Sequence, residues 1–178
     1  MLAVRDSDVT LTDGTRVHIR PIRPEDDHVL VESFRQLSPE SVYQRFFTAL
    51  PELSEGMARY LANVNETNRL ALIAEVASEL VAVGRYERTK DPGLVELALV
   101  VLDAWQNRGL GRIMLRETMQ AAQRNGIYRF RADVLAENRR MLRLLITEGD
   151  IYDRKTEAGV TTLLFTARTI TPCAPGTL

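Results

Sequence analysis

The stretch that most constrains the fold is an apolar segment followed by a glycine turn. Residues Val95–Leu102 are apolar except for Glu96, and their apolar and polar side chains do not alternate. Such a run predicts a strand that is covered on both faces. Gly109 and Gly111 follow, and a segment with helical spacing then reaches Arg124. We therefore expect a strand, a tight turn and a helix in succession within an α/β domain.

The rest of the chain predicts further strands and helices on either side of this unit. We expect strands near residues 9–11 and 17–20, joined by a turn at Asp13-Gly14, and near residues 70–75, 80–86, 128–135, 151–154 and 160–167. We expect helices near residues 24–37, 38–47, 54–61, 109–124 and 138–148. No segment before residue 171 has the composition of a linker, so residues 1–170 are expected to form one domain. Residues 171–178 contain two prolines and a glycine and are expected to be a flexible tail.

Charge and cysteine content exclude several function classes. The 178 residues carry 23 Lys and Arg against 24 Asp and Glu, unlike a basic nucleic-acid-binding chain. No apolar run approaches the ~20 residues of a membrane span, and the charges within Met1–Asp8 are unlike those of a signal peptide. Cys173 is the single cysteine, and neither His18 nor His28 has the neighbours of a metal ligand. We expect a cytoplasmic protein with no metal and no nucleic-acid or membrane partner.

The segment Gln106–Arg112 has the features of an anion site. Its two glycines allow a ligand to approach the backbone closely, and the helix that begins there directs free N–H groups and a positive dipole end outward. Phosphate is the usual occupant of such a site. The two glycines alone are also compatible with a turn that binds nothing. A dinucleotide fingerprint is not favoured, because Met114 stands at its third glycine position, and the P-loop pattern is absent.

The same segment resembles the pyrophosphate loop of the GNAT superfamily of N-acetyltransferases, Gln/Arg-x-x-Gly-x-Gly/Ala, through Gln106, Gly109 and Gly111. Residues 11–26 and 37–47 also resemble the opening of Pat-type protein lysine acetyltransferases. The resemblance extends over about residues 11–168. It implies the GNAT fold, a mixed and mostly antiparallel sheet that is splayed at the fourth main strand and has helices on both faces. It also implies acetyl transfer from acetyl-CoA to an amine by direct attack.

The Pat-like opening implies a protein lysine as the acceptor and an acyl-CoA synthetase as a partner. Two alternatives stay open: the same chemistry on a small-molecule or N-terminal amine, and a GNAT module that binds acyl-CoA without turnover. The sequence is compatible with a monomer or a homodimer.

The resemblance further implies the residues that bind acetyl-CoA. Amides of the glycine loop would hold the pyrophosphate, and the preceding strand would pair with the pantetheine arm. Asn138 would contact that arm, although it is also a favourable helix N-cap. Arg108 and Arg112 flank the loop and suit phosphate, with a solvated helix face as the alternative. The expected cofactor-binding residues are Leu99, Val101, Gln106, Asn107, Arg108, Gly109, Leu110, Gly111, Arg112 and Asn138.

Glu96 is the expected general base. It is a carboxylate within an apolar strand, where burial would strengthen it as a base. The alternative is a side chain that points to solvent near a strand end. The resemblance favours catalysis, because the general-base glutamate of Pat-type enzymes occupies this place, and it implies the backbone N–H near Val101 as the oxyanion donor.

Two positions depart from the family's pattern. Leu145 stands where the family often has a tyrosine that acts as general acid, so no side-chain acid is carried over. Gly149–Asp150 stands in place of the usual Gly-Phe, which leaves the packing beneath the last helix open.

Overall fold

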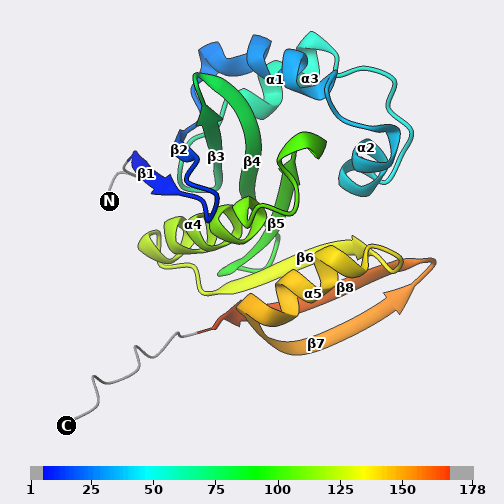
Figure 1. Cartoon of the computed structure of the whole chain (residues 1–178). Helices are drawn as coiled ribbons and strands as arrows, with labels where there is room; N and C mark the ends of the chain where they lie inside the picture. Colours follow the sequence, from blue (N-terminus) through cyan, green and yellow to red (C-terminus); the bar gives the residue numbers. More distant parts are fainter. Residues whose placement is uncertain (1–5, 169–178) are drawn as a thin grey trace, which may run out of the picture.

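An eight-stranded sheet with helices on both faces makes up the part of the chain that the computed structural model describes, residues 6–168 (Figure 1). The strands are β1 (Ser7–Thr10), β2 (Arg16–Pro21), β3 (Arg69–Val76), β4 (Glu79–Arg88), β5 (Leu94–Val101), β6 (Arg129–Leu135), β7 (Gly149–Glu157) and β8 (Val160–Ala167). The helices are α1 (Asp27–Phe34), α2 (Pro39–Phe46), α3 (Glu55–Ala62), α4 (Leu110–Arg124) and α5 (Arg139–Glu148), with 3₁₀ turns η1 (Pro24–Asp26) and η2 (Asp103–Trp105). The expected tail and Cys173 lie outside the described residues.

The strand order is β1-β2-β3-β4-β5-β6-β8-β7, and every neighbouring pair is antiparallel except β5 and β6. The mixed, mostly antiparallel α/β architecture is therefore confirmed. Among the described residues, no helix combines the length and the apolar character needed to cross a membrane.

Side-chain caps fix the starts of three helices. The hydroxyl oxygens of Ser38 and Ser54 accept hydrogen bonds from the backbone amides of Ser41 and Met57, each at 3.2 Å, and begin α2 and α3. Asn138 caps α5 in the same way. The first helix is shorter than predicted and begins as the 3₁₀ turn η1, because the Asp26 carboxylate accepts the amide of Arg23 at 2.6 Å and tightens the turn.

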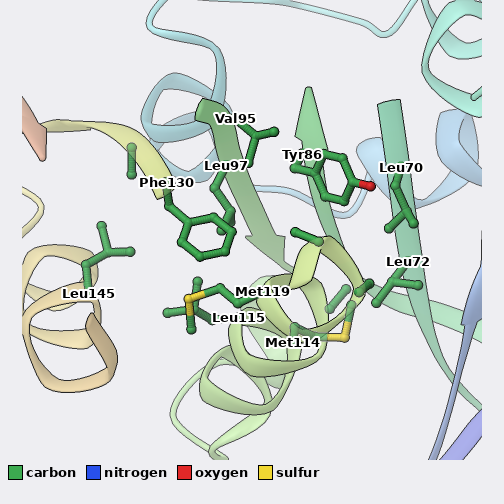
Figure 2. Close-up of a cluster of buried hydrophobic side chains, with 14 of the residues drawn as sticks. Leu70, Leu72, Tyr86, Val95, Leu97, Met114, Leu115, Met119, Phe130 and Leu145 are labelled. Carbon is green, nitrogen blue, oxygen red and sulfur yellow. The ribbon is translucent and has the colours of Figure 1, made fainter. Parts of the chain in front are cut away.

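The face of the sheet under α4 carries the larger core (Figure 2). Its buried side chains include Leu70, Leu72, Tyr86, Val95, Leu97, Met114, Leu115, Met119, Phe130 and Leu145. The helix lies very close to β4 at Gly84, where an added Cβ would be 2.3 Å from the hydroxyl oxygen of Thr118. A glycine at this position is therefore required for the packing of α4.

The opposite face carries a second core, which α1, α2 and α3 cover. Its buried side chains include Ile22, Leu30, Phe34, Val42, Leu53, Ala58, Ala71, Ile73 and Val83. Along β5, side chains alternate between the two faces. Leu97 belongs to the α4 face, whereas Ala98 and Val100 lie on the face of α1 to α3.

The sheet opens between β5 and β6. The two strands pair only through Leu94–Arg129, Val95–Phe130 and Glu96–Arg131. Beyond Glu96, β5 continues to Val101 beside β4 but without a partner on its other side. This is the expected splay at the fourth main strand, which is β5 when the short edge strand β1 is left out of the count.

Candidate functional site

A cavity of about 500 Å³ lies where β5 and β6 separate. Residues 96–101 of β5 and 132–134 of β6 form two of its walls. The first turns of α4 and α5 close it at one end, and residues of α2 cover it. We call it the splay cavity. Six of the ten expected cofactor-binding residues line it, and the other four, Arg108, Gly109, Leu110 and Arg112, do not.

The unpaired edge of β5 directs backbone groups into the splay cavity. The amide of Leu102 donates to the carbonyl oxygen of Val81 on β4 at 2.9 Å. Successive residues of a strand direct their amides to opposite sides, so the amides of Val101 and Leu99 point away from β4. Both residues line the cavity. These amides are therefore available to an extended ligand that lies along β5 as a neighbouring strand would.

The glycine loop presents free donors at the end of the same cavity. Asn107 and Gly109 have φ values of 62° and 84°, so the chain turns through left-handed conformations before α4. Within residues 6–168, no hydrogen bond uses the amide of Gly109, Leu110 or Gly111. Leu110 itself is fully buried and contributes only its backbone to the loop. The beginning of α4 therefore has the chemistry of a phosphate site.

Gly111 shows that the cavity fits a thin, extended ligand beside this loop. An added Cβ would lie 3.7–3.8 Å from side-chain carbons of Val101, Leu144 and Leu99, all of which line the splay cavity. The Cβ alone makes ordinary contacts, but any longer side chain would extend into the cavity. The residues present therefore fit an acyl-CoA, with its phosphates at the start of α4 and its arm along β5.

Gln106 holds the cavity walls together. Its side-chain amide donates to the carbonyl oxygen of Val101 at 3.1 Å and to the hydroxyl of Ser41 at 3.2 Å. Its carbonyl oxygen accepts from Arg140 at 2.7 Å. One side chain thus joins β5, α2 and α5, and its amide group is engaged within the protein.

Asn138 acts as the helix cap that the sequence also allowed. Its Oδ1 accepts the amide of Met141 at 3.0 Å, and its Nδ2 donates to Gln44 of α2 at 3.1 Å. The residue lines the splay cavity, so capping and contact with a ligand are compatible. Gln44 was not predicted as part of the site.

The two arginines that flank the loop make contacts within the protein. The Arg108 guanidinium lies 4.8 Å from the centroid of the Trp105 ring, and 3.6 Å separates it from Asp13. The Arg112 guanidinium pairs at 2.9 Å with Glu148, a buried carboxylate of α5. Both guanidiniums lie at the exposed end of the loop. Their contribution to phosphate binding stays a prediction.

Glu96 lies at the point where β5 and β6 begin to separate. The expectation that the strand buries this side chain is wrong: Glu96 is exposed, because the core under α1 to α3, on its face of the sheet, reaches Val100 of β5 but not Glu96. Glu87 on β4 and Arg131 on β6 are its neighbours in register. Burial lowers the pKa of the Arg45 guanidinium on α2, and the negative charge of Glu96 opposes this shift. The carboxylate therefore faces basic groups at the edge of the splay cavity.

A second cavity, of about 540 Å³, adjoins the first. Arg45, Glu96 and Ala98 line both cavities. We call the second one the charged cavity, because its remaining lining residues are mostly ionisable: Arg85, Glu87, Arg88, Thr89, Lys90, Asp91, Leu94 and Arg131. Sequence reasoning missed Arg45 and Arg85. The Pat-like segment 37–47 contains Arg45 and was the one signal that pointed to α2.

The two departures from the family's pattern do not leave a gap beneath α5. Leu145 is fully buried next to the core of Figure 2. A Cβ at Gly149 would lie 2.6 Å from the ring of Phe165, so this ring occupies the space in front of the glycine. Asp150 turns outward and pairs with Arg168 at 3.1 Å. The packing is complete, and no tyrosine hydroxyl is present at position 145.

Comparisons with known proteins agree on one family. The family model of the acetyltransferase (GNAT) family matches residues 32–145. The crystal structure of the GNAT domain of S. lividans Pat is 32% identical, with a TM-score of 0.85, over 90% of this chain and 96% of that chain. An acetyltransferase of Pseudomonas aeruginosa is 29% identical over 82% of this chain and 80% of its own length.

Two further relatives differ in extent. The acetyltransferase Pat of Mycolicibacterium smegmatis is 24% identical over 83% of this chain but only 45% of its own length, so this chain spans less than half of that relative. The structure of yncA from Salmonella typhimurium, solved with its cofactor acetyl-CoA, shares the fold at 16% identity, with a TM-score of 0.68 over 89% of this chain and 99% of that chain.

Proposed function

We propose that this chain, which belongs to the acetyltransferase (GNAT) family, moves the acetyl group of acetyl-CoA to the side-chain amine of a lysine in a protein. Membership of the family makes the chain an acyltransferase that uses acetyl-CoA. The lysine acceptor is our proposal, and the likeness to the GNAT domain of S. lividans Pat supports it. An acyl-CoA synthetase is the first protein acceptor to test.

One observation carries the assignment of the site: the splay cavity ends at the free amides of α4 and runs along the unpaired edge of β5. We assign the amides of Gly109, Leu110 and Gly111 to the pyrophosphate and those of Leu99 and Val101 to the pantetheine arm. Gln106 and Asn138 hold the walls in place. We assign the charged cavity, on the other side of Glu96, as the route by which the acceptor amine reaches the site.

Glu96 is the group we assign to proton transfer. A thioester supplies an activated acetyl group, and a neutral amine must attack it, so the bond from nitrogen to the acetyl carbon forms as the bond from carbon to sulfur breaks. Glu96 takes the proton of the amine, directly or through one water. The Val101 amide points into the cavity, where it can donate to the carbonyl oxygen as that oxygen gains negative charge. Because Leu145 has no acidic group, the sulfur takes its proton from solvent.

A thiol-release assay with acetyl-CoA tests this proposal. The acceptors are lysine peptides, among them peptides of acyl-CoA synthetases, peptides with only a free α-amine, and small amines. We expect thiol release with lysine peptides and an acetyl group on the lysine side chain by mass spectrometry. Release with α-amines or small amines alone would reject the lysine acceptor. Binding of acetyl-CoA without thiol release from any acceptor would reject turnover.

A further inference from the structure

Arg85 is a buried cation without a partner. Its side chain is on β4 and only 7% of the residue's surface is exposed. Its Nη2 is fully buried and has no hydrogen-bond partner. No ion pair within residues 6–168 involves this guanidinium. A buried charge is costly unless it is paired, and so such a group is expected to have a ligand.

The surroundings of Arg85 disfavour its charged form. Burial, together with the nearby cations Arg45 and Arg69, lowers the pKa of Arg85 to about 10, while Glu87 opposes this shift. Glu87 is itself engaged, because Arg69 lies 3.5 Å from it and the Tyr60 hydroxyl lies 3.4 Å from it. The Arg85 guanidinium therefore stays protonated at neutral pH, while the neighbouring Glu87 carboxylate is shared with Arg69 and Tyr60.

The sheet leaves room beside this guanidinium. The residues paired with Arg85 on the neighbouring strands are Ala71 and Ala98, so small side chains flank it. On one side it borders a small, mostly apolar cavity of about 50 Å³ under α1 and α2. On the other side it lines the charged cavity together with Arg45. An anion that enters the charged cavity can therefore reach both guanidiniums.

We propose that Arg85 and Arg45 bind a carboxylate of the acceptor, so that the enzyme selects lysines that have an acidic side chain beside them in sequence. This inference rests on the proposed lysine activity. Arg85 and Glu96 are diagonal neighbours across the β4–β5 pair, because Ala98 faces Arg85 and lies two residues from Glu96. Diagonal neighbours are about 7–8 Å apart. Both side chains lie on the same face of the sheet, so an amine at Glu96 and a carboxylate at Arg85 can belong to one acceptor peptide.

Matched peptides test the inference. Each has a single lysine, blocked ends, and either Glu or Gln at one position within two residues of the lysine. We expect kcat/KM to be at least tenfold higher for the best Glu peptide than for its Gln counterpart, because guanidinium–carboxylate bonds are strong. Arg85→Met should bring this ratio close to one. Arg124→Met, which removes an exposed arginine of α4, should keep the ratio.

Nα-acetyl-lysine and its amide form a second pair of substrates, in which the carboxylate comes from a small molecule.

A measurement without turnover separates this inference from the lysine activity. Glutarate, compared with sodium chloride at equal ionic strength, should raise the melting temperature of the wild type and of Arg124→Met but not of Arg85→Met. Equal turnover of Glu and Gln peptides by the wild type would overturn the inference and leave the lysine activity standing. Absence of turnover with every peptide, together with a glutarate shift that depends on Arg85, would overturn the lysine activity and support the carboxylate site. A preference for Nα-acetyl-lysine over its amide, without a preference among peptides, would overturn the acidic peptide as the source of the carboxylate.

Discussion

The two cavities that meet at Glu96 differ in the chemical groups that would bind their ligands. In the splay cavity, the groups that we assign to acetyl-CoA are backbone amides at the edge of β5 and the start of α4. The charged cavity is formed by arginines and carboxylates from β4, β5, β6 and α2. A site made of backbone amides binds its ligand through groups that every sequence has. A site made of side chains can change its specificity through single substitutions. The first suits the common substrate acetyl-CoA, and the second suits an acceptor that differs between enzymes.

The strongest test of this comparison is Glu96, one of the three residues that both cavities share. Glu96→Gln removes the proposed base and should lower kcat roughly 100- to 10,000-fold, the usual contribution of general base catalysis. Acetyl-CoA affinity, measured by calorimetry, should stay close to that of the wild type, because the backbone groups of the splay cavity remain. Glu87→Gln makes the same charge change on the neighbouring strand and should have a far smaller effect. Unchanged turnover of Glu96→Gln across the pH range would show that Glu96 is not the base.

Gly111→Asp tests the splay cavity alone. Any side chain longer than Cβ extends toward the space between Val101 and Leu144, and a carboxylate there repels phosphate. We expect calorimetry to show a loss of acetyl-CoA affinity of tenfold or more, about 1.4 kcal/mol.

Gly56→Asp provides the matched control for this substitution. Gly56 is the second residue of α3, as Gly111 is of α4, and an added Cβ there meets no atom within 4 Å. Aspartate in a first helical turn favours the helix dipole in both variants, so neither should lose stability. If Gly111→Asp binds acetyl-CoA as the wild type does, the loop is not part of the phosphate site.

The backbone-built cavity is also the part that the sequence predicts well. The apolar run Val95–Leu102, the glycines of the loop and the N-cap Asn138 act locally, so their patterns predict the strand, the turn and the helix. The exposure of Glu96 was predicted wrongly, because it depends on how far the helices α1 to α3 cover the sheet. Such coverage arises from packing between distant segments and has no local pattern.

The charged cavity could not be predicted from the sequence. Arg45, Arg85 and Glu96 come from three different elements and become neighbours only when α2 packs over the β4–β5 pair. Each is an ordinary residue in its own segment. The same reason hid the role of Gln106: its motif predicts contact with a ligand, whereas its side chain joins Val101 to α2 and α5.

Arg85 should reduce the stability of the fold that holds it. Its pKa of about 10 in the folded protein lies below the usual arginine value, so the unfolded chain binds the proton more tightly. Arg85→Met should therefore raise the free energy of unfolding at pH 7, by about 1–2 kcal/mol, as expected when a buried charge is replaced by an apolar side chain. The wild type should begin to regain this difference as the pH rises above about 10, because the folded protein then loses the guanidinium proton while the unfolded chain still holds it.

Urea unfolding of the two proteins between pH 6 and pH 10.5 measures this difference. Arg124→Met, which removes an exposed arginine, should match the wild type throughout. A loss of stability in Arg85→Met would mean that the guanidinium supports the fold and that the charged cavity does not reduce its stability.

The smallest expected effect concerns the enzyme's own lysines. Lys90 and Lys155 are the only lysines of the chain. Lys90 lines the charged cavity, whereas Lys155 is on β7 and pairs with Glu157 at 2.7 Å. If acceptor amines approach through the charged cavity, incubation with acetyl-CoA should acetylate Lys90 severalfold faster than Lys155 by quantitative mass spectrometry. Lys155 serves as the control, because it records the uncatalysed reaction with the thioester. Glu96→Gln should lower the Lys90 rate to the Lys155 rate.

Equal rates at both lysines in the wild type would count against the charged cavity as the acceptor's entrance. The assignment of the splay cavity to acetyl-CoA would be unaffected, because it depends on the backbone of β5 and α4.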